Sequence, residues 1–417
     1  MDSTGTGAHS TYDYVIVGAG VAAASAAKAI REHDADGTLA ILGREPDGPY
    51  YRPDLSKTLW LDGEAQLDNG WLLDGEAGTG SQDGADVRTG ASVTAIDTSA
   101  KTLTLADTST VGYEYLLLAT GSQPRELDLP ASDRIIHFRT VEDYRHLRAQ
   151  AKPGSRAVVV GGGYIGAEIS SALAQNDVSV TMLMRGATVQ GHMFPARLAE
   201  TVTQTYRDRG VTVVGESAAY GASERDDHLI VADASGETHT AEVVVVGVGV
   251  TPNDQVARAA GITVDDGIIV DRRLATNAPD VWAAGDVARY EDALLGDRRV
   301  EHVDSAEHMG AVAGRNMAVA RTRKGDPESY TYTPIFWSDL FDYGYEAVGD
   351  LDSSLETVED FTDDGSAGVV YFLDTGRVRG VLLWNVWDST DKAKQIIEQS
   401  TAEPLDAAEL KGRISLG

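Results

Sequence analysis

The sequence predicts an α/β protein with two Rossmann-like domains and a C-terminal α+β domain, and three observations lead to this prediction. Residues 12–30 combine a short apolar run, a glycine-rich turn and an alanine-rich segment with helical spacing. Residues 157–175 repeat that order of strand, turn and helix. After residue 327 aromatic residues cluster and alternating strands follow. Because a strand, a tight turn and a helix N-terminus together bind pyrophosphate, the repeat implies two dinucleotides, or one dinucleotide and a degenerate copy.

The first unit turns through GAGVAA, where three positions carry the nucleotide-binding interpretation. Gly18 allows the turn, Gly20 lets backbone N–H groups approach phosphates, and Ala23 lets the helix pack close to the strand. Alone the motif is a weak signal, because glycine-rich turns occur in many α/β proteins. The next strand, 39–42, is followed by Glu45, which is placed to accept hydrogen bonds from a ribose. A loop charge without a ligand is the alternative.

Two cations follow in PYYRPDLSKTLW, residues 49–60. Arg52 and Lys57 lie close in sequence to the first turn in an otherwise anionic chain. Arg52 is suited to pair with pyrophosphate oxygens, and Lys57 to place its ammonium beside an electron-accepting ring. The alternative is that both are surface cations.

Two later strands run into motifs with ligand-binding character. The apolar strand 113–120 leads into ATGSQPR, where Gly121 can take a positive φ and Pro124 stops regular structure. TNAPDVWAAGD, residues 276–286, predicts a turn, a strand and a turn. Asp286 then lies at the carboxyl end of a buried strand, where parallel sheets bind ligands, and can accept hydrogen bonds from polyol hydroxyls.

The second unit places GGGYIGAE between a strand at 157–160 and a helix. Gly161, Gly163 and Gly166 hold the three positions of the phosphate-binding turn. A further strand, 243–246, runs into GVGVTPN.

Composition excludes several classes of function. The 417 residues, 42% of them hydrophobic, suffice for a large core in roughly two to three domains. Because there is no cysteine, disulfides, thiolate metal sites, iron–sulfur clusters and redox-active cysteine pairs are excluded. The histidines are dispersed, so no metal site is expected. The first eleven residues predict a flexible tail without a signal peptide, and no run approaches the roughly 20 apolar residues of a membrane span, which favours a cytoplasmic protein.

The formal net charge of −30 arises from 65 acidic and 35 basic residues. Such a surface repels nucleic acid and anionic lipid, so neither is an expected partner. The acidic residues are scattered along the chain, which favours a surface suited to high salt over an acidic patch for one basic partner.

With these residues in view, the chain resembles the two-domain flavoproteins of the pyridine nucleotide-disulfide oxidoreductase superfamily, ferredoxin-reductase type. The opening turn and the motifs at 119–125 and 276–286 look like that family's three FAD-binding motifs. GGGYIGAE and GVGVTPN look like its nicotinamide-nucleotide motifs. The resemblance implies an FAD domain at 1–150 and 263–327, an NAD(P) domain at 151–262 and a C-terminal α+β domain at 328–417.

Within that superfamily the chain is most similar to the apoptosis-inducing factors. RPDLSKTLW is shared by the ferredoxin reductases and the apoptosis-inducing factors, and 300–317 is similar to a stretch that brings a helix N-terminus to the flavin. The stretches 336–361 and 380–388 resemble the C-terminal domain of the apoptosis-inducing factors. The departures are the lack of a targeting segment, a short 360–369 stretch and the acidic surface, and these put death signalling and DNA binding in doubt. Together with the charge, they suggest a halophilic, haloarchaeal homologue.

The resemblance implies which residues bind the cofactors. For FAD these are Gly18, Gly20, Ala23, Glu45, Arg52, Lys57, Ala119, Thr120, Gly121, Arg125, Gly285, Asp286, His302 and Trp337. For the nicotinamide nucleotide they are Gly161, Gly163, Gly166, Glu168, Arg185 and Gly249.

It also implies a catalytic group made of Lys57, Glu168, Tyr164, His302 and Trp337. Lys57 would lie by flavin N5 and pair with Glu168, because a buried carboxylate needs a cation and a cation there favours reduced flavin. Tyr164 would stack near the nicotinamide or gate it. His302 and the following helix would border the pyrimidine end of the flavin, and Trp337 would cover the ring. The alternatives are core aromatic side chains and a helix cap.

The donor is NADH or NADPH. The strand 179–184 ends in Met184-Arg185-Gly186, where NADH-using relatives usually place a glutamate, and Arg185 is a candidate to attract a 2′-phosphate. Gly166, in contrast, is typical of NADH users.

We therefore expect an FAD-dependent NAD(P)H oxidoreductase that passes electrons to a ferredoxin-like protein, a quinone or another small-molecule acceptor. The alternative is a slow redox sensor or assembly protein that signals through a charge-transfer complex and forms a homodimer, as apoptosis-inducing factor can.

Overall fold

The structure, a computed structural model, describes residues 10–73 and 84–416. It divides into two compact units, each built from three stretches of chain. The first unit comprises the chain up to Arg52, Gln66–Gln123 and Thr251–Pro334. The second comprises Pro53–Ala65, Pro124–Val250 and Ile335–Gly417. Most of the expected N-terminal tail lies outside the described residues, but Ser10 and Thr11 already belong to the first strand.

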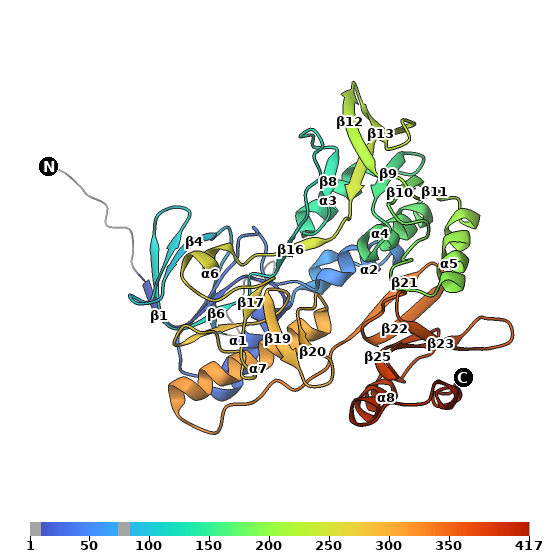
Figure 1. The fold of residues 1–417 in the computed structure, drawn as a ribbon. Coiled ribbons are helices and arrows are strands. Elements are labelled where there is room, and N and C mark those ends of the chain that lie inside the picture. The colour runs from blue at the N-terminus through green and yellow to red at the C-terminus, as the bar shows by residue number, and fades with distance from the viewer. Residues whose placement is uncertain (1–9, 74–83, 417) are drawn as a thin grey trace. The chain divides into compact units, whose positions relative to one another are not determined.

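The core of the first unit is a seven-stranded sheet with the order β3-β2-β1-β6-β5-β4, in which β18 also pairs with β6 (Figure 1). Its strands are β1 (Ser10–Val17), β2 (Leu39–Leu42), β3 (Ala85–Arg88), β4 (Val93–Asp97), β5 (Thr102–Leu105), β6 (Thr110–Leu118) and β18 (Val281–Ala283). β1, β2, β3, β6 and β18 are parallel, whereas β4 and β5 pair antiparallel. The apolar runs that end β1 and β2 are buried throughout, as strands covered on both faces require.

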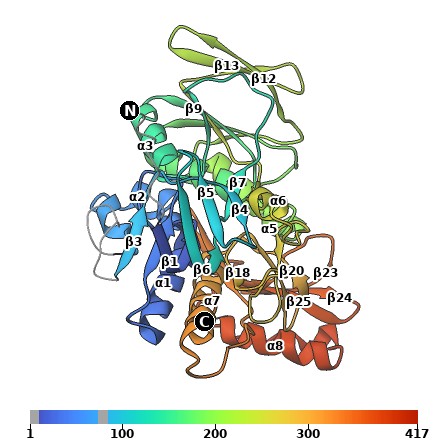
Figure 2. The same cartoon turned by 90° about the vertical axis from the view of Figure 1, so that its left-hand side faces the viewer.

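Helices α1 (Val21–His33) and α7 (Val303–Thr322) lie side by side in this unit, as Figures 1 and 2 both show. Two glycines of α7 make the close approach possible. A Cβ at Gly310 would lie 2.3 Å from the Ala22 carbonyl oxygen, and one at Gly314 would lie 2.3 Å from the Ala26 carbonyl oxygen. Since neither backbone oxygen can move aside cheaply, the spacing of four residues in α7 fixes how α1 and α7 pack.

Shorter elements complete the first unit. They are the three-stranded sheet of β17 (Ile268–Ile269), β19 (Ala288–Asp292) and β20 (Gly296–Arg298), the helix α6 (Gln255–Ala259) and a 3-10 helix at Leu67–Gly70. A further 3-10 helix covers Arg52–Leu55, and β7 (Ser122–Pro124) pairs with β16 (Val250–Pro252).

The second unit contains a five-stranded parallel sheet with the order β11-β10-β9-β15-β8. Its strands are β8 (Ile135–His137), β9 (Arg156–Val160), β10 (Ser179–Leu183), β11 (Thr212–Val214) and β15 (Val243–Val246), and its helices are α2 (Thr58–Leu61), α3 (Val141–Gln150), α4 (Tyr164–Gln175) and α5 (Ala196–Asp208). An antiparallel sheet of β12 (Ala219–Arg225), β13 (His228–Asp233) and β14 (Thr238–Ala241) adjoins it.

The place of β8 differs from the expected domain division. The expected first domain extends to residue 150, yet β8 pairs with β15 of the second sheet. The segment Lys152-Pro-Gly154, whose composition suggests a boundary, is therefore a turn inside the second unit. Local turn signals cannot show that a short strand joins a partner more than a hundred residues further along the chain.

The second unit also holds the C-terminal α+β part, an antiparallel sheet with the order β21-β22-β25-β24-β23. Its strands are β21 (Ile335–Leu340), β22 (Tyr343–Gly349), β23 (Glu356–Phe361), β24 (Gly368–Asp374) and β25 (Arg377–Trp384). Helix α8 (Thr390–Ala402) packs along this sheet, against β25 and β22 (Figure 2), and a 3-10 helix covers Ala407–Glu409. The predicted α/β fold with a C-terminal α+β part is confirmed. Among the residues described, no helix combines the length and the apolar character needed to cross a bilayer.

Candidate functional site

Four loops of the first unit meet at one edge of its sheet. Val17 at the end of β1 pairs with Leu42 at the end of β2 and with Leu118 at the end of β6. Ala283 at the end of β18 also pairs with Leu118. The loops that follow these strands therefore leave the sheet side by side, at the carboxyl edge where α/β proteins bind ligands.

The glycine-rich turn after β1 has the geometry expected of a phosphate site. Gly18 has φ +114°, and a Cβ there would lie 2.0 Å from the Ala119 carbonyl oxygen. Gly20 precedes α1, no side chain caps that helix, and a Cβ at Gly20 would meet nothing within 4 Å. Ala23 is fully buried against the sheet. The first-turn N–H groups of α1 are thus left for an anion.

Arg52 and Glu45 form a polar group with Tyr50. The Arg52 Nη2 and Glu45 Oε1 atoms are 2.9 Å apart, and the Tyr50 hydroxyl donates to Glu45 Oε2 at 2.7 Å. Arg52 Nη1 in turn donates to the Tyr50 hydroxyl at 2.6 Å. Although burial alone lowers the pKa of the guanidinium, Tyr50 and Glu45 raise the pKa of Arg52 above its ordinary value. Arg52 is therefore a fixed cation.

The loops after β6 and β18 bring Asp286 and Ser122 together. The Ser122 hydroxyl donates to Asp286 Oδ2 at 2.8 Å. Gly285 has φ +77°, and a Cβ there would lie 3.2 Å from the Ala22 side chain, so the loop packs against α1. Thr120 is held by the carbonyl of Asn253, to which its hydroxyl donates at 2.8 Å. Gly121 has the positive φ predicted from its sequence context, +63°.

His302 immediately precedes α7, which no side chain caps. The residue is partly exposed, but its Nδ1 atom is buried. Burial and the positive charge of Arg298 lower the pKa of His302 to about 4, although Asp286 acts in the opposite direction. The imidazole is therefore neutral near pH 7.

The second unit repeats this arrangement. Val160 at the end of β9 pairs with Leu183 of β10 and with Val246 of β15, so the following loops share one edge. Gly161 has φ +120°, and a Cβ there would lie 2.2 Å from the Gly247 carbonyl oxygen. A Cβ at Gly166 would lie 2.0 Å from the Gly161 carbonyl oxygen.

Gly163 precedes α4, which no side chain caps, and a Cβ there would meet nothing within 4 Å. Like Gly20 before α1, this position leaves first-turn N–H groups for an anion.

Three further predicted binding residues have different surroundings. Arg185 is exposed directly after β10, and no ion pair to it is found among the described residues. Arg125 is also exposed, and its Nε atom donates to the Val250 carbonyl oxygen at 3.1 Å. Gly249 has φ +98° and accepts from the backbone N–H of Arg125 at 2.9 Å.

The expected pair of Lys57 and Glu168 is present. Glu168 lies in α4 and is 5% exposed, and the Lys57 Nζ atom is 2.6 Å from its Oε1 atom. Two serines complete the coordination of the carboxylate. Ser56 donates to Oε2 and Ser338 donates to Oε1, each at 2.6 Å. The carboxylate thus receives three donors, which offsets the cost of burying its charge.

Tyr164 of α4 contacts one face of strand β21, and Trp337 lies on the other face of that strand. Tyr164 begins α4 and is 36% exposed, and its ring meets Phe336 edge-on at a centroid distance of 5.8 Å. Because side chains alternate along a strand, Trp337 lies on the face opposite Phe336 and Ser338. The aromatic partner of Tyr164 within the second unit is therefore Phe336.

The predicted residues fall into two groups. Gly18, Gly20, Ala23, Glu45, Arg52, Ala119, Thr120, Gly121, Gly285, Asp286 and His302 belong to the first unit, and Lys57, Arg125, Gly161, Gly163, Tyr164, Gly166, Glu168, Arg185, Gly249 and Trp337 to the second. Sequence reasoning missed Tyr50, Ser56, Ser122 and Ser338. The first three lie within motifs already singled out, so a search for donors near each predicted charge finds them. For Ser338 the sequence carries no such signal.

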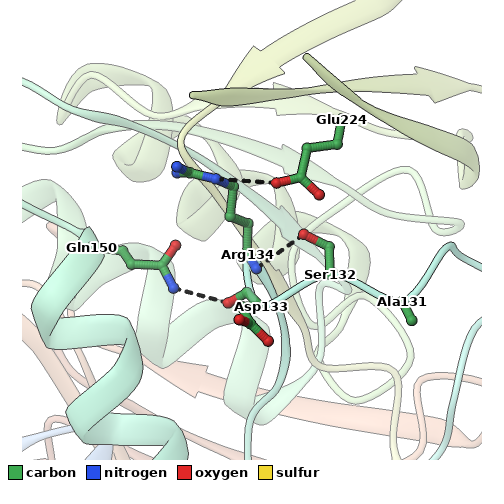
Figure 3. Close-up of a pocket in the computed structure, with 6 residues that line it drawn as sticks. All are labelled: Ala131, Ser132, Asp133, Arg134, Gln150 and Glu224. Atoms are coloured by element: carbon green, nitrogen blue, oxygen red, sulfur yellow. Dashed lines mark hydrogen bonds and ion pairs between the residues drawn. The ribbon is translucent and has the colours of Figure 1, made fainter. Parts of the chain in front are cut away.

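A separate depression of about 540 Å³ in the second unit is lined by Ala131, Ser132, Asp133, Arg134, Gln150 and Glu224 (Figure 3). Some of its polar groups are paired: the Arg134 Nε atom is 3.5 Å from Glu224 Oε1, and Gln150 donates to the Asp133 carbonyl oxygen at 2.9 Å. Since it contains none of the predicted binding residues, it is distinct from the two glycine-rich edges.

Two sheets whose parallel strands each lead to a positive-φ glycine turn and an uncapped helix at the carboxyl edge are the arrangement typical of α/β proteins that bind two dinucleotides. Comparison with known proteins agrees. Residues 12–310 match the family model described as pyridine nucleotide-disulphide oxidoreductase, and residues 313–366 match the C-terminal model of mitochondrion-associated apoptosis-inducing factor. The chain belongs to the pyridine nucleotide-disulphide oxidoreductase family.

Relatives of both expected subgroups are found. Apoptosis-inducing factor 1 of Dictyostelium discoideum is 32% identical over 95% of this chain and 80% of its own length. The ferredoxin–NAD(+) reductase component of the anthranilate 1,2-dioxygenase system of Burkholderia cepacia is 35% identical over 83% of this chain and 84% of its own length. The crystal structure of the covalent putidaredoxin reductase–putidaredoxin complex superposes with a TM-score of 0.84 at 27% identity, covering 96% of this chain and 95% of that one.

The chain is thus an oxidoreductase of the ferredoxin-reductase type, with homologues like apoptosis-inducing factor. The family depends on FAD and NAD(H). The residues described above fit both groups, because each unit offers an open helix N-terminus beside a turn that tolerates no side chain, and the first adds a partly buried cation at Arg52.

Proposed function

We propose that the protein takes electrons from NAD(P)H and delivers them to a ferredoxin-like protein, with FAD held by the first unit and the nicotinamide nucleotide by the second. The observation that carries this proposal is the repeated edge itself: a positive-φ glycine turn followed by an uncapped helix, once after β1 and once after β9. When bound, FAD accepts a hydride from the nicotinamide and releases electrons to the acceptor. The division into FAD, NAD(P) and C-terminal domains belongs to the same proposal.

In the first unit the phosphates of FAD would be bound by the N–H groups of α1 and by Arg52. Asp286, oriented by Ser122, would accept hydrogen bonds from the ribityl hydroxyls. Glu45 would accept hydrogen bonds from the adenosine ribose while its ion pair holds Arg52 in place. His302, as a neutral imidazole at the start of α7, would lie toward the pyrimidine part of the flavin, where the helix N-terminus favours negative charge.

In the second unit Lys57 would place its ammonium near the reacting end of the flavin. Glu168 anchors that ammonium through the 2.6 Å contact. Tyr164, supported by Phe336, would contact or gate the nicotinamide. Trp337, a partly exposed residue on the face of β21 opposite Phe336, would cover the flavin. The exposed guanidinium of Arg125 donates to the Val250 carbonyl oxygen. Arg125 would therefore contribute to cofactor binding mainly by holding the backbone at Val250 in place.

The proposal extends to the electron acceptor and to the compartment in which the protein works. The relative in the anthranilate dioxygenase system is named as a ferredoxin–NAD(+) reductase, and the superposed reductase was crystallised with putidaredoxin. Both support a ferredoxin-like acceptor, with a quinone or another small molecule as the alternative. The net charge of −30 supports a cytoplasm of high salt.

Anaerobic stopped-flow reduction tests the proposal. The holoprotein in high salt is mixed with NADH or NADPH, and flavin absorbance is followed before a screen of ferredoxins, quinones and dyes. We expect rapid bleaching followed by rapid reoxidation by a ferredoxin. Failure of both nucleotides to reduce the flavin would refute the proposed activity, and reoxidation by quinones alone would refute the ferredoxin assignment.

The preference between NADH and NADPH is predicted to depend on Arg185. We propose that its unpaired guanidinium contacts the 2′-phosphate of NADPH. Because a hydrogen bond to a charged group contributes about 1.5–3 kcal/mol, Arg185→Glu should raise the Kd of NADPH by about tenfold or more. The Kd of NADH should change much less. Arg207→Glu, an exposed site on α5, makes the same change of charge and is the control; an equal loss for both nucleotides at Arg185 would contradict the phosphate role.

A second function is favoured by the match of residues 313–366 to the apoptosis-inducing factor C-terminal model. In this alternative the protein is a redox sensor or assembly factor that stays reduced with bound nucleotide and forms a homodimer. Light scattering of oxidised and NADH-reduced holoprotein separates the two. A shift to dimer with slow reoxidation by every acceptor supports the sensor, whereas an unchanged mass with fast reoxidation supports the electron carrier.

A further inference from the structure

The buried carboxylate of Glu168 connects two parts of the second unit. On one side it is bonded to Ser56 and Lys57. On the other it is bonded to Ser338, a fully buried residue of β21 in the C-terminal sheet. The position of the Lys57 ammonium therefore depends on a hydroxyl from a strand far along the chain.

Ser338 leads directly to a buried tyrosine. It faces Tyr345 in the β21–β22 ladder, so the two side chains project side by side from the same face of the sheet. Tyr345 is 0% exposed, and its ring packs edge-on against the rings of Phe194 and Phe336, at centroid distances of 5.3 Å and 6.4 Å. Burial foremost, with Glu168 among the contributors, raises the pKa of Tyr345 well above its ordinary value, so the phenol keeps its proton.

Gln190 continues the path to the nucleotide-binding turn. Its backbone N–H donates to the Gly162 carbonyl oxygen at 2.8 Å, and its side chain is 0% exposed. Its φ of +53° is unusual for a residue other than glycine, and the inward side chain accompanies that conformation. Gln190 thus joins the middle of the turn formed by Gly161 and Gly163 to the interior of the unit.

The Tyr345 hydroxyl and the Gln190 side-chain amide are complementary hydrogen-bonding groups. The Phe194 backbone N–H donates to the Gln190 carbonyl oxygen at 3.1 Å and the Phe194 ring meets Tyr345 at 5.3 Å, so Gln190 and Tyr345 are packed against the same residue. In keeping with this placement, Gln190 and Ser338 both lower the pKa of the Tyr345 phenol. No hydrogen bond of normal geometry is formed by the hydroxyl or by the amide atoms within the described residues. Since a buried polar group without a hydrogen-bond partner is destabilising, these groups gain most by bonding to one another.

We propose that Gln190, Tyr345 and Ser338 form a buried polar relay that couples occupation of the nucleotide turn at Gly162 to the position of the Lys57–Glu168 pair. The inference rests on the proposed function, because it presumes a nucleotide at the turn and a flavin near Lys57. The three are positioning residues: they act through Glu168 and Lys57. A pyrophosphate at the turn would accept from backbone N–H groups such as that of Gly163, which shares a peptide group with the Gly162 carbonyl, and the relay passes the change to Ser338 and the carboxylate.

The test uses ADP-ribose, which carries the pyrophosphate and both riboses but no nicotinamide ring. It can therefore influence the flavin of the holoprotein only through the protein. The flavin midpoint potential is measured with and without ADP-ribose, and the Kd of ADP-ribose for the oxidised form is measured by calorimetry. Because binding and reduction are linked, a shift in potential reports different affinities of ADP-ribose for the oxidised and the reduced holoprotein.

We expect ADP-ribose to shift the potential of the wild type, and the shift to fall by at least half in Tyr345→Phe and in Ser338→Ala. The Kd for the oxidised form should change by less than about twofold, since the turn itself is intact. Tyr371→Phe is the matched control, because Tyr371 is another fully buried tyrosine of the same sheet whose hydroxyl forms no hydrogen bond of normal geometry with any residue that the structure describes, and in the strand ladders it faces Val358 and Val381 instead of Ser338.

Stability supplies a second readout. If the Tyr345 hydroxyl belongs to the relay, Tyr345→Phe lowers the urea midpoint of unfolding, whereas loss of an unsatisfied hydroxyl leaves that midpoint unchanged or raises it. A full wild-type shift in both relay variants overturns the relay, as does the absence of any shift in a wild type that NADH or NADPH still reduces. Failure to bind FAD or to be reduced by either nucleotide counts against the proposed function instead.

Discussion

At the scale of single residues, the surroundings of Glu168 determine what Lys57 can do. The carboxylate is almost fully buried, and its three donors come from Ser56, Lys57 and Ser338 at 2.6 Å each. A buried ion pair adds little net stability compared with an apolar pair, but removal of one partner is costly because the other charge stays buried. The pair is therefore better explained by placement of the ammonium than by stability of the fold.

Lys57→Met should keep FAD bound and slow flavin reduction. The phosphate-binding residues of the first unit are unaffected, whereas the cation that favours reduced flavin is lost. We expect reduction by NADH to slow by about tenfold or more, as for loss of one electrostatic contact to developing charge, and unfolding to require about 3 kcal/mol less. Stopped-flow reduction and urea unfolding measure the two effects.

Lys152→Met, at an exposed position of the same unit, should show neither effect. Hydride-transfer kinetics unchanged by Lys57→Met would remove Lys57 from the reacting site.

His302 should make the protein less stable in acid. Its pKa is about 4 in the folded chain and about 6.5 in the unfolded chain, so the unfolded state binds the proton more readily. The stabilising contribution is complete above pH 6.5, decreases as the pH falls, and is fully lost below about pH 4; the loss is at most about 3 kcal/mol.

Urea unfolding between pH 7 and pH 4 measures this contribution. His302→Gln should flatten the decline over that range, and His308→Gln on the same helix should not. A decline of wild-type steepness in His302→Gln would contradict the assignment.

At the scale of elements, the packing of α7 on α1 supports the first nucleotide site. α1 carries the open N-terminus after Gly20, and Gly310 and Gly314 let α7 approach it to backbone contact. Helix propensity alone predicts that Gly310→Ala stabilises α7 by about 1 kcal/mol. The 2.3 Å approach to the Ala22 carbonyl oxygen predicts the opposite sign, because the new methyl group forces the helices apart.

Gly310→Ala should therefore lower the free energy of unfolding by about 1–3 kcal/mol and weaken the retention of FAD. Thermal unfolding and release of flavin fluorescence measure the two effects. Ala311→Gly, at the exposed neighbouring position, should cost only the propensity difference and leave FAD bound. Stabilisation by Gly310→Ala would mean that α1 and α7 pack less tightly than the structure indicates.

The elements also show what sequence alone can predict. Both strand–turn–helix units were predictable, because their glycines are needed for a local reason: Gly18 and Gly161 adopt φ values of +114° and +120°, which residues other than glycine rarely tolerate. The place of β8 was not, since a three-residue strand carries no periodicity and its partner β15 lies far along the chain. The same limit hid Ser338, whose contact with Glu168 joins residues 170 positions apart.

For the whole molecule, the net charge of −30 is the property that no single contact explains. Many acidic side chains are paired locally, for example Asp297 with Arg289 at 2.7 Å, yet the 65 carboxylates outnumber the 35 cations. The unpaired remainder repels itself most strongly in the compact state. The fold should therefore be most stable where mobile ions screen that repulsion.

The unfolding midpoint should rise steadily as KCl is raised from about 0.1 M to about 1 M, because the Debye length falls from about 10 Å to about 3 Å over that range. Thermal unfolding of the holoprotein measures the rise, and KCl is used because sulfate would also strengthen apolar burial. Neutralising the exposed Asp36, Asp226 and Asp363 as asparagines makes the net charge less negative by three and should reduce the dependence on salt at the low end of the range. A midpoint that is flat or falls with KCl would show that screening does not limit stability, and the acidic surface would then be better explained by a basic partner than by a saline environment.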